Sequence, residues 1–136
     1  MAATDPTYSY SRRLFIQDLL TLVWFLIDTG SDVSCLPATA EDRKKEPIRL
    51  LYAANGTSMK VYGEKLIKIE FGLNRELTWV MLITDVETPI IGADFLEHFD
   101  LSPDLRRKRL NDNSTGTHSE TKGYTKTVSY THLTLP

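Results

Sequence analysis

Short apolar runs separated by polar turns occur along most of the chain. Residues 14–16 and 22–27 are rich in aliphatic and aromatic residues, and residues 67–71 alternate apolar and charged positions. Residues 77–83 form a more continuous apolar run. Period-two alternation and short apolar runs are typical of β-strands. The pattern therefore predicts an all-β fold, and the apolar positions of residues 94–99 fit one short C-terminal helix.

A β-hairpin is predicted between residues 49 and 62. The runs 49–52 and 59–62 flank residues 53–58, whose sequence AANGTS contains Asn-Gly. Asn-Gly is a strong hairpin signal because both residues tolerate positive φ. The small tip would allow a peptide backbone to approach closely. An ordinary surface hairpin is the alternative interpretation.

Three other segments lead to structural expectations. Residues 17–21 must connect the first two strands, but they lack a glycine and carry two leucines, which indicates an unorthodox or damaged turn. Residues 40–47 are charged and predict a solvated loop. Asp94, followed by Glu97, resembles a helix cap that places Phe95 and Phe99 on one face.

Size, charge and cysteine content restrict the class of protein. The 136 residues suffice for one domain. The 16 basic and 18 acidic residues give a net charge of −2, so we expect no nucleic-acid partner. The single cysteine, Cys35, favours a reducing, cytoplasmic compartment. The histidines, His98, His118 and His132, lack ligand-like spacing, so no metal site is predicted.

The N-terminal region partly imitates a secretion signal. Arg12 and Arg13 precede the apolar run 19–27, and the small residues 38–40 follow it. Gln17 and Asp18 interrupt the apolar region, and nine residues are too few to span a bilayer. A buried strand is therefore favoured, with no membrane association. The alternative, a small secreted β protein, would show a cleaved N-terminus.

The composition divides the chain into three parts. We expect residues 1–11 to form a flexible N-terminus and residues 12–110 to form a folded domain. The Ser/Thr-rich residues 111–136 are expected to form a disordered tail. The last nine residues also resemble translated sequencing-adaptor read-through, so an artefactual tail is the alternative to a disordered one. The basic run 106–109 is most simply a solvated face, and a nucleic-acid patch or a processing region are the alternatives.

The candidate chemistry centres on Asp28. It directly follows the apolar residues 24–27 and precedes Thr29 and Gly30, so a carboxylate lies at the end of a buried strand. Burying a carboxylate costs several kcal/mol (about 2–7 for a neutral polar group and more for a charge) unless it is compensated, which makes such groups functional candidates. A plain turn is the alternative interpretation of these three residues.

Two segments resemble known motifs. Residues 23–36 resemble the active-site segment of aspartic proteases, and residues 89–96 resemble the apolar-apolar-Gly strand and helix of the retroviral branch, the retropepsins. The resemblance covers roughly residues 12–110. It implies a closed aspartic-protease-like β-barrel half, of the kind encoded in retrotransposon polyproteins. The predicted hairpin would then be the flap that folds over bound peptide.

The resemblance also implies a mechanism. Two carboxylates are needed to activate water and protonate the scissile carbonyl, but the chain has one Asp-Thr-Gly. A homodimer would bring Asp28 of each copy together, with Thr29 bracing the pair and Gly30 leaving room for water. The implied function is an endopeptidase that cleaves extended polypeptides, including a polyprotein, without a cofactor. The alternative is an inactive dimer, either a peptide-binding module or a decayed retroelement.

The remaining site residues follow from the same resemblance. The implied substrate-binding residues are Leu26, Ser31, Asp32, Val33, Ala53, Ala54, Asn55, Gly56, Thr88 and Ile90. Two positions depart from the viral pattern. Ala93 replaces a common arginine, so an ion pair to Asp32 is missing. Ser31 replaces a common alanine, and we expect its hydroxyl to donate to Asp28 and lower the pKa of that carboxyl.

Overall fold

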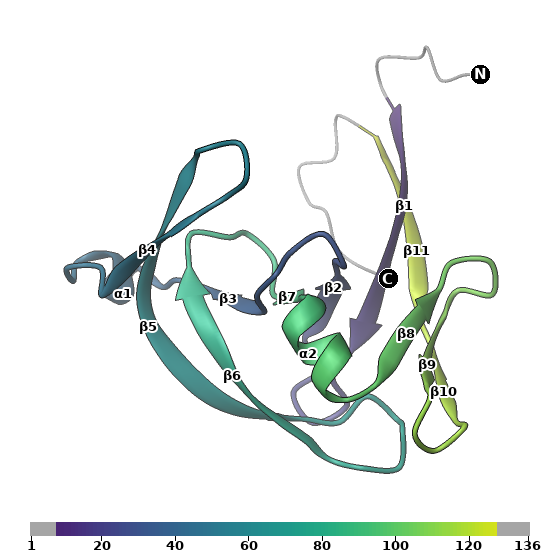
Figure 1. The fold of residues 1–136 in the computed structure, drawn as a ribbon. Helices are drawn as coiled ribbons and strands as arrows, with labels where there is room; N and C mark the ends of the chain where they lie inside the picture. Colours follow the sequence, from purple (N-terminus) through teal and green to yellow (C-terminus); the bar gives the residue numbers. More distant parts are fainter. Residues whose placement is uncertain (1–7, 128–136) are drawn as a thin grey trace.

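The computed structural model describes residues 8–127 (Figure 1). These residues form eleven strands and two short helices. The elements are β1 Tyr8–Gln17, β2 Trp24–Ile27, β3 Cys35–Pro37, α1 Ala40–Arg43, β4 Arg49–Tyr52, β5 Ser58–Ile69, β6 Leu77–Thr84, β7 Ile90–Ile91, α2 Ala93–His98, β8 Leu101–Asp104, β9 Arg109–Asp112, β10 His118–Glu120 and β11 Lys122–Thr127. The prediction of an all-β fold is confirmed.

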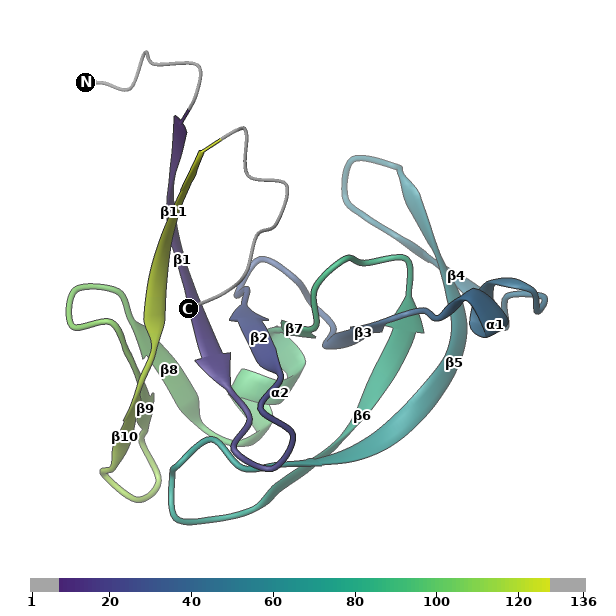
Figure 2. The same cartoon turned by 180° about the vertical axis from the view of Figure 1, so that it is seen from behind.

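The strands form two sheets (Figures 1 and 2). The larger has eight strands in the order β11-β1-β2-β7-β3-β6-β5-β4, and the smaller has three in the order β10-β9-β8. Most neighbours are antiparallel, but β2 pairs with β7, and β3 with β6, in parallel. Since β7 lies between β2 and β3, the segment joining β2 to β3 must pass beside the β7–α2 junction.

The main core lies between the large sheet and α2. Phe25 of β2 meets Phe71 edge-to-face, and Phe71 meets Phe95 of α2 in the same way. Aliphatic side chains from both sheets join the cluster, including Ile16 of β1, Leu77 of β6 and Leu110 of β9. Cys35 is buried in a second cluster, and burial raises the pKa of its thiol, so it acts as a small apolar residue.

The segment 40–47 contains a short helix, so the prediction of a loop is wrong for α1. Thr39 and Asp42 form a capping box in which each side chain accepts a hydrogen bond from the other's backbone N–H. The carboxylate of Asp42 also accepts a hydrogen bond from the Thr39 hydroxyl at 2.9 Å. None of the helical residues is buried, so no apolar periodicity in the sequence could reveal this single turn.

The turn without glycine is organised by Asp18. This residue is only 2% exposed, and its carboxylate accepts hydrogen bonds from the Thr21 hydroxyl, at 2.7 Å, and from the backbone N–H of Glu70, at 2.9 Å. Leu22 takes a positive φ of 66°, a conformation that glycine usually supplies. The chain therefore closes this hairpin with a buried carboxylate, while Leu19 and Leu20 remain exposed.

The predicted domain boundaries need correction at both ends. Strand β1 begins within the segment 1–11, and β9, β10 and β11 occupy much of residues 111–127, so the prediction of disorder there is wrong. β11 pairs antiparallel with β1 in the large sheet. Residues 1–7 and 128–136, including the adaptor-like run, lie outside the described residues.

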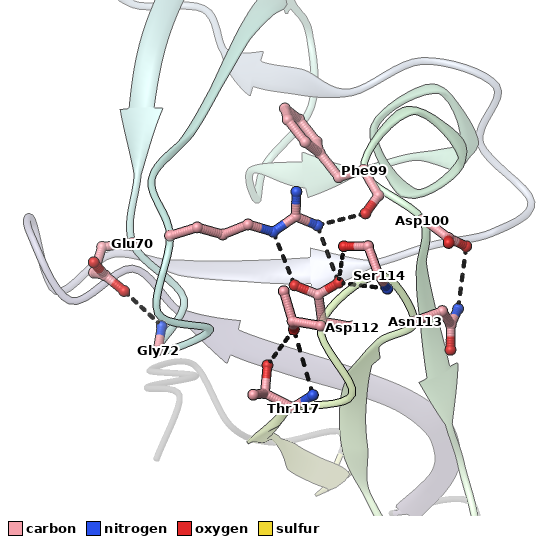
Figure 3. Close-up of polar contacts among 10 residues, drawn as sticks. Glu70, Gly72, Phe99, Asp100, Asp112, Asn113, Ser114 and Thr117 are labelled. Carbon is pink, nitrogen blue, oxygen red and sulfur yellow. Dashed lines mark hydrogen bonds and ion pairs between the residues drawn. The ribbon is translucent and has the colours of Figure 1, made fainter.

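The C-terminal strands are joined to the rest of the fold by Asp112. Figure 3 shows its side chain beside Ser114, which donates to it through both its N–H and its hydroxyl. Arg75 donates to both carboxylate oxygens, at 2.8 and 3.1 Å. Leu110 of β9 is buried in the main core, and the buried ion pair and backbone pairing hold the segment that follows it, which an apolar pattern does not record.

Candidate active site

The carboxylate of Asp28 lies immediately beyond the buried strand β2. The backbone N–H of Asp28 donates to Ile91 O of β7 at 2.9 Å, which fixes the point where the chain leaves the sheet. Gly30 N–H donates to Asp28 Oδ1 at 3.0 Å. Asp28 is half-buried, whereas Thr29 and Gly30 are exposed. The carboxylate is therefore held by backbone groups and still reaches solvent.

The loop that follows Asp28 packs against Gly92. Leu26 and Ile90 are register partners in the parallel β2–β7 pair. Ala93 N–H donates to Ser31 O at 2.7 Å. A Cβ at position 92 would lie 2.5 Å from Val33 O and 2.7 Å from Ser31 O. Glycine is required here because of this close approach, although its φ of −99° suits any residue.

We expect Gly92→Ala to destabilise the fold by about 1–3 kcal/mol, because the new methyl group must displace the backbone of the Asp28 loop. The matched control is Gly63→Ala in β5, where the nearest atom to a new Cβ is Ile83 Cδ1 at 3.8 Å. Urea unfolding followed by tryptophan fluorescence measures both. Equal stability of Gly92→Ala and the parent would contradict this account of the packing.

A second set of contacts supports the loop from behind. Asp94 Oδ1 accepts the Ser34 hydroxyl at 2.7 Å, and Asp94 Oδ2 accepts Trp79 Nε1–H at 3.0 Å. The Ser34 oxygen in turn accepts Gly92 N–H at 2.8 Å. This hydrogen-bonded chain joins β6, the Asp28 loop and α2. No local sequence pattern reveals these contacts, because Ser34 and Asp94 lie 60 residues apart.

Two expectations about polar side chains in this region are wrong. Asp94 does not cap α2, because the N-cap residue is Gly92 and no side chain caps the helix. The Ser31 hydroxyl does not donate to Asp28, because its hydrogen is used in a 2.7 Å bond to Val33 O. The Ser31 hydroxyl therefore forms its hydrogen bond within its own loop.

The other residues implied by the resemblance lie in three loops. Asp32 is exposed and Val33 is half-buried in the Asp28 loop, and Thr88 lies just before Ile90 of β7. Ala53, Ala54, Asn55 and Gly56 form the exposed turn of the β4–β5 hairpin, in which Asn55 Oδ1 accepts Thr57 N–H at 3.1 Å and Gly56 has a φ of 87°. The predicted hairpin is confirmed.

These loops share one end of the molecule. In both views the tip of the β4–β5 hairpin, the loop after β2 and the loop before β7 lie on the same side (Figures 1 and 2). Within residues 8–127 no hydrogen bond joins the hairpin tip to the Asp28 loop. The base of the hairpin shares an apolar cluster with the site, in which Leu51 and Met59 lie with Val33, while the tip stays exposed.

The described residues contain no group of three or more His, Cys, Asp or Glu side chains arranged to hold a metal ion. No helix among them is long and apolar enough to cross a membrane.

Comparison with solved structures identifies the fold. The retroviral protease-like domain of Ddi1 from Leishmania major matches with a TM-score of 0.59 and 17% identity, covering 81% of this chain and 94% of that chain. EIAV protease in complex with the inhibitor HBY-793 matches with a TM-score of 0.47 and 20% identity, covering 74% and 94%. No protein-family profile and no curated protein sequence matches. The chain has a retropepsin-like fold.

Proposed function

We propose that this chain is an aspartic endopeptidase in which Asp28 activates water. The observation that carries the proposal is the position of Asp28. Its carboxylate projects from the end of a buried strand and is oriented by Gly30 N–H, in a loop packed tightly against Gly92. A retropepsin-like fold that presents an Asp-Thr-Gly turn in this way suits hydrolysis of a peptide bond.

The proposed active form is a homodimer, because one chain supplies only one suitable carboxylate. Asp94 is held by Ser34 and Trp79, and Asp32 is an exposed residue of the loop outside the Asp-Thr-Gly turn. No hydrogen bond joins Asp28 to another carboxyl group in the described part of the chain. A two-fold axis beside Asp28 would bring a second copy of the same carboxylate to it.

In the proposed mechanism the two Asp28 carboxyls share one proton, because adjacent like charges do not both ionise readily. The ionised carboxylate takes a proton from water, and the protonated one donates to the carbonyl oxygen of the scissile bond. Thr29 would brace the pair across the axis. Gly30, which has no side chain, would leave space for the water and the substrate.

The proposed substrate is an extended polypeptide. The exposed tip of the β4–β5 hairpin would act as a flap, and its backbone amides would pair with the peptide backbone. Leu26, Val33, Thr88 and Ile90 would contact substrate side chains, with Ser31 and Asp32 nearer the peptide backbone. We propose a polyprotein as the natural substrate because the motifs resemble those of retroviral and retrotransposon enzymes. The buried free thiol of Cys35 suits the proposed cytoplasmic location.

The test is hydrolysis of a pool of unstructured peptides at about pH 5, measured over a series of protein concentrations. A dimeric enzyme that is mostly monomeric at low concentration should show a rate that rises with the square of the concentration. A rate that rises linearly throughout, with a monomer in sedimentation, would contradict the dimer. No cleavage by a well-folded dimer would contradict the peptidase and favour the inactive peptide-binding module.

A further inference from the structure

The net charge of the chain conceals an uneven distribution. Residues 14–100 carry eight Lys or Arg against 14 Asp or Glu, whereas residues 8–13 and 101–127 together carry eight Lys or Arg against three Asp or Glu. The first range contains the candidate active site. The second comprises most of β1, β11 and the three-stranded sheet. Such asymmetry between parts of one chain is typical of binding to a polyanion.

Strand pairing brings the basic residues of the second range together. The side chain of Lys108 packs against Gly123 of β11, and Lys108 O accepts Thr121 N–H at 3.0 Å. Gly123 is opposite Leu14, directly beside the β1 irregularity that contains Arg12 and Arg13. Both views show the β8–β9 turn beside β11 (Figures 1 and 2). We define the basic patch as Arg12, Arg13, Arg106, Arg107, Lys108, Arg109 and Lys122.

Internal carboxylates neutralise part of this patch, because Asp104 and Glu120 are the strand partners of Arg109. Asp104 pairs with Arg107 at 3.2 Å, and Glu120 lies 3.2 Å from His118. No ion pair engages Arg12, Arg106, Lys108 or Lys122 within the described part of the chain, and all four are exposed. The Nε atom of Arg109 is buried and has no hydrogen-bond acceptor among the described residues. The charges of these four side chains are therefore left for an external anion to compensate.

We propose that the basic patch binds the phosphate backbone of a nucleic acid without base specificity. Five of its seven residues are arginines, whose planar guanidinium groups bind phosphate oxygens in a bidentate manner. The charges extend from the β8–β9 turn to β1 and β11, which suits a strand that carries regularly spaced phosphates. A membrane surface fits less well, because Leu105 is the one strongly exposed aliphatic residue in residues 101–123. The proposal does not depend on peptidase activity.

The test uses the full chain and fluorescence anisotropy. The probes are a labelled oligouridine of about 16 nucleotides and a mixed-sequence DNA duplex, each at about 50 and about 200 mM NaCl. If five cations contact phosphates of the single strand, its affinity should fall by about 100-fold between these salt concentrations. Arg106→Gln combined with Lys108→Gln should weaken binding roughly tenfold and reduce the slope of log affinity against log salt by about 1.4.

The matched control is Lys44→Gln combined with Lys45→Gln, which removes the same charge from exposed positions at the end of α1. Binding by the control equal to that of the parent supports the patch. Equal weakening by both double variants would show a response to net charge alone and overturn the proposal. Absence of binding to either probe at the lower salt concentration would also overturn it. Sedimentation only with phosphatidylserine vesicles would assign the patch to a membrane surface instead.

Discussion

Replacing Asp28 by Asn is expected to reduce peptide hydrolysis by about a thousandfold or more without unfolding the protein. The amide cannot accept a proton from water, and general acid–base groups contribute on the order of 10²–10⁴-fold to a rate. The fold should persist because the Asn oxygen can still accept Gly30 N–H in place of Asp28 Oδ1. Hydrolysis of a fluorogenic peptide, compared with the thermal unfolding midpoint, measures both effects.

The matched control for this substitution is Glu46→Gln. It also removes one carboxylate, from an exposed position in the segment between α1 and β4, so hydrolysis should be unchanged. Equal hydrolysis by the Asp28 variant and the parent would assign the activity to another residue. An unfolded Asp28 variant would instead show that the carboxylate is needed for the structure of the loop.

The same variant tests the shared site. In a homodimer that needs Asp28 from both copies, an excess of the inactive variant should capture parent chains in inactive mixed dimers and suppress hydrolysis. If one chain supplied every catalytic group, the added variant would leave the rate unchanged. The mixing experiment therefore separates a shared catalytic pair from a site contained in one subunit.

Much of the large sheet could be predicted from the sequence because its strands carry their own signals. The end of the apolar run 22–27 marks β2, which is buried on both faces, and the alternation from Ile67 to Phe71 marks one buried face. Asn55-Gly56 marks a hairpin turn. The position of Asp28 after β2 was predicted for the same reason. A buried strand followed directly by a carboxylate and a Thr-Gly turn is visible without knowledge of the tertiary contacts.

Other parts of the structure depend on contacts between distant residues. The turn at Asp18 is stabilised by Glu70 N–H, and the Asp28 loop by Ser34 with Asp94, so neither device has a local signature. Strands β10 and β11 consist mainly of polar residues, and backbone pairing with β9 and β1 holds them in place. Hydrophobic periodicity does not detect strands of this kind.

Substituting Arg75 with Met is expected to lower the free energy of unfolding at neutral pH by about 3–5 kcal/mol. The side chain of Asp112 has no exposed surface, and Arg75 donates to both of its oxygens. Without Arg75 the buried carboxylate keeps neutral donors, chiefly those of Ser114 (Figure 3), and no cation. Phe99 O also loses its hydrogen bond from Arg75. Urea unfolding followed by tryptophan fluorescence measures the change.

The control for this substitution is Lys44→Met, which breaks the exposed Lys44–Glu41 pair at 3.3 Å. That pair is solvated on both sides, so its loss should change the stability little. A loss in Arg75→Met no larger than in Lys44→Met would show that the C-terminal strands do not depend on the buried ion pair. The contrast between the two variants isolates the effect of burial on an ion pair.

The pH dependence gives an independent check of the same ion pair. Burial raises the pKa of Asp112, but hydrogen bonds from Ser114 and Arg75 lower it by more, so the pKa lies below that of an ordinary aspartate. The stability from this group is therefore present above about pH 4 and is lost as the pH falls through the folded-state pKa. The difference in free energy of unfolding between the parent and Arg75→Met should therefore decrease as the pH is lowered. The double variant Arg75→Met/Asp112→Asn should recover part of the loss at neutral pH, because no uncompensated charge then stays buried.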